Sequence, residues 1–370
     1  MDLWANLNRD LLQLIAEKIT CHTDVLRFGA TCKQWRSIVT NSLHFLPPNL
    51  PISLCLPIQK PLPLLMQCPI EDKLGSINFL SVSDMKSYGK FLVPELNNKV
   101  IAGSSNGWLL TVELNSQEIK LLNPLTRNQI PLPSLSTLEN PEGEDFGFIL
   151  KAIISSNANK RNLGDDCIVM AIISELSILS FCRPGDDKWT YVNQYTFNLY
   201  DVIPYKGQFF AINETGTTVA YDVSNDDVKM KLIAKGDYSP RRRYLVESTS
   251  GELLHVERVL DEQTETFTTN FIVYKLESRE GLLECELCWV ESESLGDQAL
   301  FLGLNCSLSL PAQSFRGCKS NCIYFTDDIE YLDSSYDMGV YDLEDRKIQM
   351  FGDMDKCFSF PPIWISPNPW

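Results

Sequence analysis

Residues 199–233 read LYDVIPYKGQFFAINETGTTVAYDVSNDDVKMKLI, and this stretch decides the fold of the larger part of the chain. It contains four short runs rich in apolar and β-branched residues, at 199–203, 208–212, 218–223 and 228–233. The runs are separated by the turn segments Lys206-Gly207, Glu214-Thr215-Gly216 and Asn225-Asp226. Such runs, bounded by Gly, Asn and Asp, are typical of strands joined by hairpin turns. Four of them in succession predict one blade of a β-propeller.

The same plan recurs along the chain. A second unit predicts strands at Val100–Ala102, Trp108–Glu113, Glu118–Leu122 and Gln129–Leu132. Further units lie near 147–195, 241–291 and 298–351, with a less regular one near 52–95. Their spacing of about 40 to 50 residues is that of four-stranded blades. We therefore expect a mainly β protein in which residues 46–370 form a propeller of six four-stranded blades. Five or seven blades, with the last completed by the C-terminus, and a pair of β-sandwiches are the alternatives.

The first 45 residues have a different period. Apolar side chains recur at helical spacing in three segments: Leu11, Ile15 and Ile19; Val25, Leu26 and Phe28; and Cys32, Trp35 and Val39. Residues four apart share one face of a helix, and Thr23-Asp24 can cap the second segment. A module this small closes no core of its own. We expect residues 1–45 to form three short helices whose remaining apolar surface is covered by another protein.

Charge separates these two regions and excludes one class of ligand. The chain carries a net charge of −16. Residues 1–45 hold five basic and four acidic side chains, a net of +1, so residues 46–370 carry −17. A body this acidic repels phosphate backbones, so we do not expect nucleic acid as a partner. The single basic run, Arg241-Arg242-Arg243, fits a strand start or an ion-pair feature better than a phosphate site.

Composition also bears on the compartment. No apolar run approaches the length needed to cross a bilayer, so we expect no membrane association. Trp4, Leu7 and Asp10 stand where a signal peptide carries a basic flank and a longer apolar run. The twelve cysteines show no short-range framework and are interpreted as reduced thiols. We expect a protein of the nucleus, the cytoplasm or both.

The sequence offers little support for a catalytic site or a metal site. Of the three histidines, His255 alone lies in the body, on an expected strand without a nucleophile beside it. Cys285 and Cys288 have the spacing of half a zinc site, with Cys318 and Cys322 as a candidate second half. Residues three apart on a strand point to opposite faces, however, so one ion cannot hold both thiols there. We expect no catalytic residue, metal or cofactor, with an enzyme on the propeller as a remote alternative.

The order and spacing of residues in the N-terminal helical module resemble those of a known family. Leu7, Asp10-Leu11-Leu12, Ile15, Asp24-Val25-Leu26-Arg27 and Cys32-Lys33-Gln34-Trp35-Arg36 resemble an F-box, the segment that docks on the Skp adaptor of cullin-RING ubiquitin ligases. The resemblance implies a Skp-type adaptor as partner and, through it, a cullin. It also implies adaptor-binding positions at Leu7, Leu11, Ile15, Leu26, Cys32 and Trp35. Asn8 stands where the pattern usually has proline. Asn8 can cap the helix instead, so we expect adjusted or weaker docking.

The body resembles the same class of protein. Gly107-Trp108-Leu109-Leu110, Asn123-Pro124, Cys182-Arg183-Pro184-Gly185-Asp186, Tyr221-Asp222-Val223 and Pro361-Pro362-Ile363-Trp364 look like blade motifs of plant F-box proteins with a KIB-type β-propeller. Most of these motifs are structural: Asn123 is expected to make a turn, and Trp108 and Trp189 to fill space between blades.

Together the two resemblances imply a substrate-recognition subunit of a Skp–cullin–F-box ubiquitin ligase. In that role the propeller holds a protein for ubiquitination and degradation, and no residue of the chain performs chemistry. The alternative is an interaction or scaffold protein with a decayed F-box. The departure at Asn8 favours this alternative. The sequence identifies neither the protein substrate nor a substrate-binding residue. The acidic loops Glu139–Asp145 and Asp327–Asp337 are candidates for meeting a basic target, but their composition fits solvated loops better.

Overall fold

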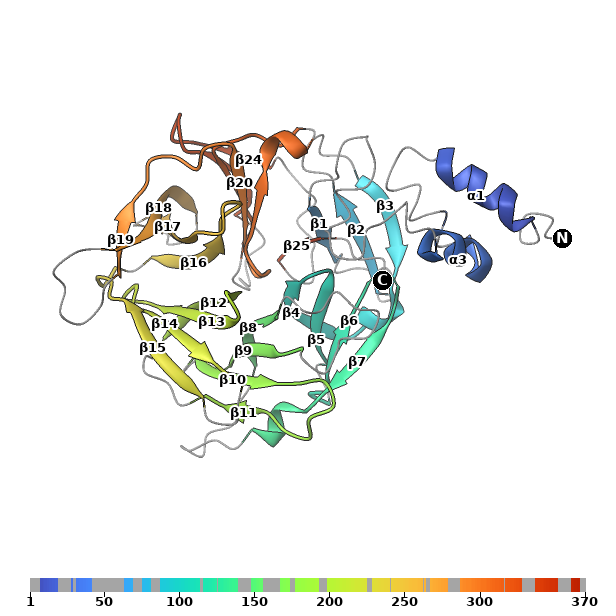
Figure 1. The fold of residues 1–370 in the computed structure, drawn as a ribbon, viewed down its shortest axis with the longest axis horizontal. Coiled ribbons are helices and arrows are strands. Elements are labelled where there is room, and N and C mark those ends of the chain that lie inside the picture. The colour runs from blue at the N-terminus through green and yellow to red at the C-terminus, as the bar shows by residue number, and fades with distance from the viewer. Residues whose placement is uncertain are drawn as a thin grey trace.

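In the computed structural model, the described residues form two α-helices beside a ring of six β-sheets (Figure 1). The structure describes residues 7–18, 28, 31–41, 63–68, 75–80, 87–113, 116–124, 126–138, 148–155, 167–173, 177–192, 198–224, 228–239, 241–261, 263, 267–278, 287–315, 317–327, 337–351 and 361–366. The expected domain boundary at residue 45 lies outside these ranges. No helix within them is long and apolar enough to cross a membrane.

Six sheets form the ring, which confirms the expected number of blades. Blade 1 contains β1 (Leu64–Gln67), β2 (Ser76–Leu80), β3 (Ser87–Leu92) and β25 (Ile363–Ile365). Blade 2 contains β4 (Lys99–Ser105), β5 (Trp108–Glu113), β6 (Ile119–Leu122) and β7 (Gln129–Leu132). Blade 3 contains β8 (Ile149–Ile154), β9 (Val169–Ile173), β10 (Ile178–Cys182) and β11 (Thr190–Tyr191).

The other three blades follow in chain order. Blade 4 contains β12 (Leu199–Tyr205), β13 (Gln208–Asn213), β14 (Thr218–Asp222) and β15 (Lys229–Ala234). Blade 5 contains β16 (Arg242–Glu247), β17 (Leu253–Leu260), β18 (Thr268–Ser278) and β19 (Leu287–Glu291). Blade 6 contains β20 (Gln298–Leu302), β21 (Leu308–Pro311), β22 (Cys322–Phe325), β23 (Gly339–Asp342) and β24 (Lys347–Met350).

The C-terminal strand closes the ring at the first blade. β25 pairs with β1, with Leu65 opposite Trp364, so the first sheet combines strands from the two ends of the described chain. The alternative considered from the sequence, in which the C-terminus completes the last blade, is therefore wrong. Blade 6 already has five strands without β25. This pairing covers the edge of β1, and β25 becomes the terminal strand of the sheet.

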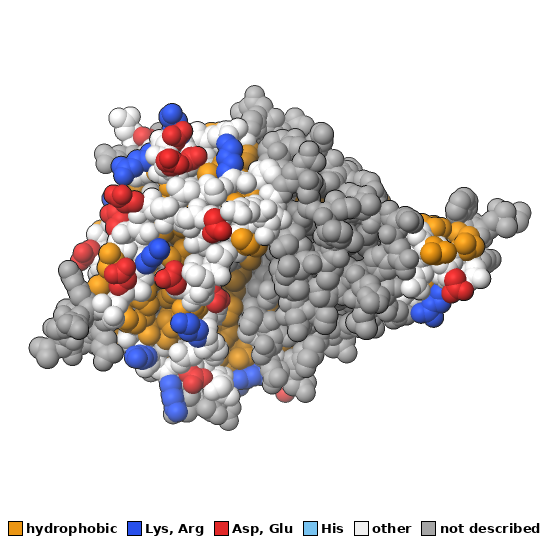
Figure 2. Space-filling view, turned by 45° about the horizontal axis from the view of Figure 1, so that its top comes forward, with side chains coloured by type: hydrophobic (Ala, Val, Ile, Leu, Met, Phe, Trp, Pro, Cys, Tyr) orange, Lys and Arg blue, Asp and Glu red, His pale blue; other side chains and the backbone are white. Residues whose placement is uncertain are grey.

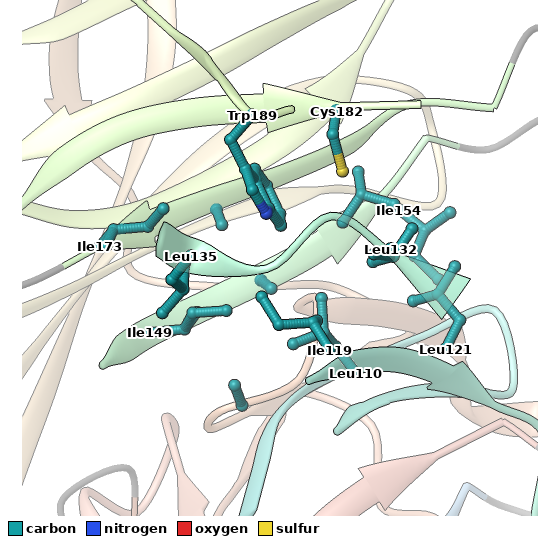
Figure 3. Close-up of a cluster of buried hydrophobic side chains, with 14 of the residues drawn as sticks. Leu110, Ile119, Leu121, Leu132, Leu135, Ile149, Ile154, Ile173, Cys182 and Trp189 are labelled. Carbon is teal, nitrogen blue, oxygen red and sulfur yellow. The ribbon is translucent and has the colours of Figure 1, made fainter. Parts of the chain in front are cut away.

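Apolar side chains pack between neighbouring blades. One such core joins blades 2 and 3 and contains both Trp108 and Trp189, as expected. Figure 3 shows Trp189 among the aliphatic side chains of this core. The indole of Trp189 donates a hydrogen bond to the Pro133 carbonyl at 2.8 Å, which satisfies its polar group inside this core. In blade 3, β9 and β10 are buried at every position, because blades 2 and 4 cover the two faces of this sheet.

Bulges shape the inner strands near their first residues. The register shifts at Ile101/Gly103 in β4, at Ile149/Lys151 in β8 and at Leu199/Asp201 in β12. A bulge adds one residue to a strand and turns the side chains beside it. In blades 3 and 4 the residues after the bulge, Lys151 and Asp201, form a buried ion pair with 2.6 Å between Nζ and Oδ1. In β8 and β12 the bulge therefore precedes a charged residue that is buried between blades 3 and 4.

Blade 6 departs from the four-stranded plan. β20 runs parallel to β22 and antiparallel to β21, so β20 and β21 form an extra hairpin. Its tip, residues 303–307, reaches strands of other blades: Cys306 N–H donates to the Ser104 carbonyl at 2.7 Å, and Lys151 Nζ lies 3.4 Å from the Gly303 carbonyl. Leu304 packs on the core between blades 1 and 2, and Cys306 on cores of blades 3 to 5. This axial hairpin, residues 298–311, therefore fills the centre of the ring.

Candidate adaptor-docking site

One face of helix α1 (Arg9–Lys18) carries apolar side chains that nothing in the described chain covers. Leu11, Leu14 and Ile15 are 50%, 55% and 38% exposed. Figure 2 shows hydrophobic side chains gathered at the helical end of the molecule, on the right. Leu12 and Ala16 on the other face are buried, and α1 packs against α3 (Lys33–Asn41). The helix therefore keeps a small inner face and presents an apolar outer one.

Asn8 caps this helix, as the sequence predicts. Its side-chain Oδ1 accepts a hydrogen bond from the Asp10 backbone N–H at 3.0 Å, and its carbonyl accepts from Leu12 N–H at 3.0 Å. An N-terminal asparagine of this kind satisfies a backbone donor that the helix itself leaves unpaired. Asn8, which stands where the F-box pattern usually has proline, therefore stabilises the start of α1 by side-chain capping.

Aromatic and polar contacts fix α3 against the start of the chain. The rings of Phe28 and Trp35 lie 4.4 Å apart, centroid to centroid. Gln34 Nε2 donates to the Leu7 carbonyl at 2.9 Å, which ties α3 to the residue before the cap. Cys32 immediately precedes α3, and its carbonyl accepts from Arg36 N–H at 2.9 Å. The two helices therefore form a small unit with few buried side chains.

The positions expected to bind an adaptor have different environments. Leu11 and Ile15 share the exposed face, whereas Leu7, Cys32 and Trp35 are half-buried. Leu26, most of the expected second helix and Ile19 lie outside the described residues. Leu14 also belongs to the exposed face but was not among the predicted positions, because a four-residue spacing from Leu11 selects Ile15 and not Leu14. Its spacing of three from Leu11 was the available signal.

The basic run Arg241–Arg243 forms ion pairs within blade 5, as expected. Arg243 Nη1 and Arg241 Nη1 lie 2.7 and 2.8 Å from the two carboxylate oxygens of Glu257. His255 is buried beside them, stacked on Tyr274 at 5.1 Å. Burial, and secondarily Arg243, hold the pKa of His255 well below its usual value. A buried neutral histidine packed in this way is a structural residue.

The described cysteines are free thiols, and Asn123 forms a turn. Eight cysteines in the described ranges are free thiols, and burial raises the pKa of Cys68, Cys306 and Cys322 to about 12. Cys288 lies on β19, while Cys285 falls outside the described residues. Within the described ranges, no three His, Cys, Asp or Glu side chains are grouped so that they could hold a metal ion. Asn123 Oδ1 accepts from Thr126 N–H at 3.1 Å, which confirms the expected turn.

Comparison with known proteins agrees with this architecture. Residues 79–342 match the KIB1-4 β-propeller family. Along 99% of its length the chain is 28% identical to the F-box protein SKIP23 of Arabidopsis thaliana, of which the alignment covers 96%. It is also 28% identical to the F-box protein At2g17036 of the same plant, over 99% of this chain and 95% of that one. Most of the propeller lies in the matched range, and the chain belongs to the KIB1-4 β-propeller family.

Proposed function

We propose that this protein is the substrate-recognition subunit of a Skp–cullin–F-box ubiquitin ligase. The observation that carries the proposal is the uncovered apolar face of α1, formed by Leu11, Leu14 and Ile15. Exposed apolar surface on a small helical unit is removed from water when a partner covers it. Similarity over the whole length to plant F-box proteins supports a Skp-type adaptor as that partner.

The mechanism is one of proximity. The adaptor and cullin connect the chain to the subunits that carry activated ubiquitin, while the propeller holds a target protein. Tethering raises the effective concentration of the target's lysines at the ubiquitin carrier, and this requires no catalytic residue in the chain itself. Nucleus and cytoplasm are the compartments in which this assembly is proposed to act.

The test is capture by a plant Skp adaptor on co-expression with the full chain. The double variant Leu11→Asp, Ile15→Asp places two charges in the apolar face, so it should lose stoichiometric capture because burying an unpaired charge is costly. Met230→Asp makes the same chemical change at an exposed apolar residue of β15 and should be captured like the unaltered chain. Circular dichroism of all three proteins checks that the β-sheets remain folded.

Two results would contradict the proposal. Capture that survives the double substitution would show that the exposed face of α1 is not the docking surface. Failure of the unaltered chain to bind any adaptor would favour the scaffold alternative, in which the helical unit no longer docks. A capped, folded α1 with its apolar face exposed argues for the ligase subunit.

A further inference from the structure

A buried arginine holds the segment that connects β15 to β16. Residues 235–239 form neither helix nor strand, and Asp237 and Tyr238 are exposed. Arg243 of β16 is 2% exposed, and its Nη2 donates to the Asp237 carbonyl at 3.0 Å and to Ser239 Oγ at 2.8 Å. One guanidinium therefore binds the two residues that flank the exposed Tyr238.

Two glycines allow a close approach to this guanidinium. A Cβ at Gly216, in the turn between β13 and β14, would lie 2.4 Å from Arg243 Nη1. A Cβ at Gly236 would lie 2.5 Å from the Thr215 carbonyl oxygen. The β13–β14 turn therefore packs tightly against both Arg243 and the segment 235–239, which fixes the position of the guanidinium.

The guanidinium of Arg243 has one donor that the described residues leave unused. Its Nη1 lies 2.7 Å from Glu257 Oε1 and 3.4 Å from His255 Nε2. Its Nε is buried and has no hydrogen-bond partner among the described residues. Nε and Nη2 lie along one edge of the planar group, and from such an edge arginine donates two parallel hydrogen bonds to a phosphate. The Ser239 hydroxyl already accepts from Nη2 on this edge.

The charges around this edge suit an attached anion better than a free one. Glu257 is shared by Arg243 and Arg241, whose Nη1 lies 2.8 Å from Oε2. Two further carboxylates belong to the segments that meet here: Asp237, which is exposed, and Glu214, which accepts from an asparagine amide at 2.9 Å. These carboxylates oppose the entry of a free anion. A phosphate bound covalently to Ser239 is held at Arg243 by its own attachment.

The sequence at this position has the pattern of a kinase substrate. Residues 237–243 read DYSPRRR, so Ser239 is followed by proline and then by three arginines. Serine before proline is the pair that proline-directed kinases modify, and kinases select among such pairs by the charge of neighbouring residues. The residue before a proline is restricted to extended conformations, in which a substrate segment binds along a kinase groove. The chain has one other Ser-Pro pair, at Ser366, which is followed by Asn-Pro-Trp and has no arginine after it.

We propose that Ser239 is a phosphorylation site for a proline-directed serine/threonine kinase, and that Arg243 binds the resulting phosphate. Ser239 Oγ attacks the γ-phosphorus of ATP, the bond from that phosphorus to the β–γ bridging oxygen breaks, ADP leaves, and the hydroxyl proton passes to the kinase's base. Ser239 is half-buried and must first turn away from Arg243, but residues 235–239 have no strand pairing to lose. The phosphate then accepts from Nε and Nη2 of Arg243 in charge-assisted hydrogen bonds. This modification is independent of the proposed ligase role.

The first test uses the full chain, a purified cyclin-dependent kinase and Mg-ATP, with mass spectrometry to locate the phosphate. The folded chain should gain one phosphate at Ser239, and Ser239→Ala should gain none. Ser366 is the matched control, because it has the same Ser-Pro pair without the arginines and should stay unmodified. Absence of phosphate from Ser239, modification of Ser366 at an equal rate, or modification of Ser239 only in chain unfolded with urea would each overturn the site.

The second test measures whether Arg243 binds the phosphate. The second pKa of phosphoserine is about 6, and a neighbouring positive charge lowers it. Titration by phosphorus NMR should give a pKa about 1 lower in the folded phosphoprotein than in the same protein unfolded with urea. Arg243→Gln should lose most of this difference, whereas Arg241→Gln should keep it, and circular dichroism checks that both variants fold.

Equal values in the folded and unfolded phosphoprotein, or a difference that survives Arg243→Gln, would overturn the role of Arg243. Neither measurement depends on adaptor capture, so the phosphorylation site and the proposed ligase role succeed or fail separately.

Discussion

Charged side chains are buried as ion pairs in this ring, and two of these pairs join neighbouring blades. Lys151 with Asp201 joins blades 3 and 4, and Arg258 with Asp337 joins blades 5 and 6 at 2.9 Å. Arg258 also donates to Thr268 and to the Thr326 carbonyl. Removing one member of such a pair leaves a buried charge without its partner and costs about 3–5 kcal/mol. These pairs thus favour a single arrangement of neighbouring blades over a looser one.

His255 gives one of these clusters a pH dependence. Its pKa in the folded protein is well below the value of about 6.5 in an unfolded chain. Below about pH 6.5 the His255 imidazole binds a proton in the unfolded state but stays neutral in the folded state until its lower pKa is reached. The free energy of unfolding therefore falls as pH decreases. The slope approaches about 1.4 kcal/mol per pH unit. Urea denaturation between pH 7.5 and 5 should show it.

The matched variant for this prediction is His255→Phe, which keeps an aromatic ring between Tyr274 and Trp289. Its stability should fall less steeply with acid than that of the unaltered chain, because other titrating groups are common to both proteins. Identical pH profiles would show that folding does not lower the pKa of His255.

Single residues were the least predictable part of this molecule. Arg241 and Arg243 were expected in ion pairs, and the structure confirms this, but their partner Glu257 could not be named from the sequence. Lys151 and Asp201 look like ordinary strand residues in a period-two pattern. Their burial follows from bulges, which add one residue and reverse the expected alternation beyond it. For the same reason, the alternation could not predict that Leu150 is 38% exposed.

Elements were predictable where a strand and its turn are local in sequence. The four strands of blade 4 and their tight turns match the expected runs, because short hairpins are specified by their own Gly, Asn and Asp residues. β4 extends from Lys99 to Ser105, beyond the expected Val100–Ala102, since pairing with β5 continues past the apolar run. The axial hairpin was not foreseen. Its parallel pairing of β20 with β22 depends on contacts distant in sequence.

Helix α1 offers a prediction at the scale of an element. Asn8→Ala removes the side-chain cap on Asp10 N–H and should destabilise the start of the helix by about 1 kcal/mol. Hydrogen exchange of the first-turn amides should then quicken about fivefold, and adaptor affinity should fall with it. Asn8→Ser keeps a capping oxygen and serves as the control. Unchanged exchange in Asn8→Ala would mean that tertiary contacts, not the cap, fix the first turn.

The whole molecule is held closed by one strand. Trp364 of β25 is buried, donates from Nε1 to the Leu302 carbonyl at 3.0 Å and meets Phe301 edge-on. Blade 1 is therefore joined to blade 6 by the same side chain that anchors the closing strand. The six-bladed plan was predictable from repeated units, whereas the partner of the last strand was not, because pairing between distant strands leaves no local signal.

Loss of this side chain should weaken the entire ring. Trp364→Ala leaves a cavity at the closing strand and should lower the free energy of unfolding by about 3–5 kcal/mol, measured by urea denaturation. Trp364→Phe keeps most of the packing and loses one hydrogen bond, so its cost should be clearly smaller. Equal, small losses in both variants would show that closure depends on the strand's backbone pairing alone.

Closure by β25 also sets an order of events during synthesis. β1 and β25 are separated by about 300 residues, so at a translation rate of roughly 5–20 residues per second the first sheet waits roughly 15–60 s for its innermost strand. Throughout that interval β1 has an unpaired edge, the kind of edge that recruits foreign strands. Helices α1 and α3 are already synthesised by then. An adaptor bound early to α1 would therefore accompany an unfinished ring, and a chaperone that covers β1 would act in the same interval.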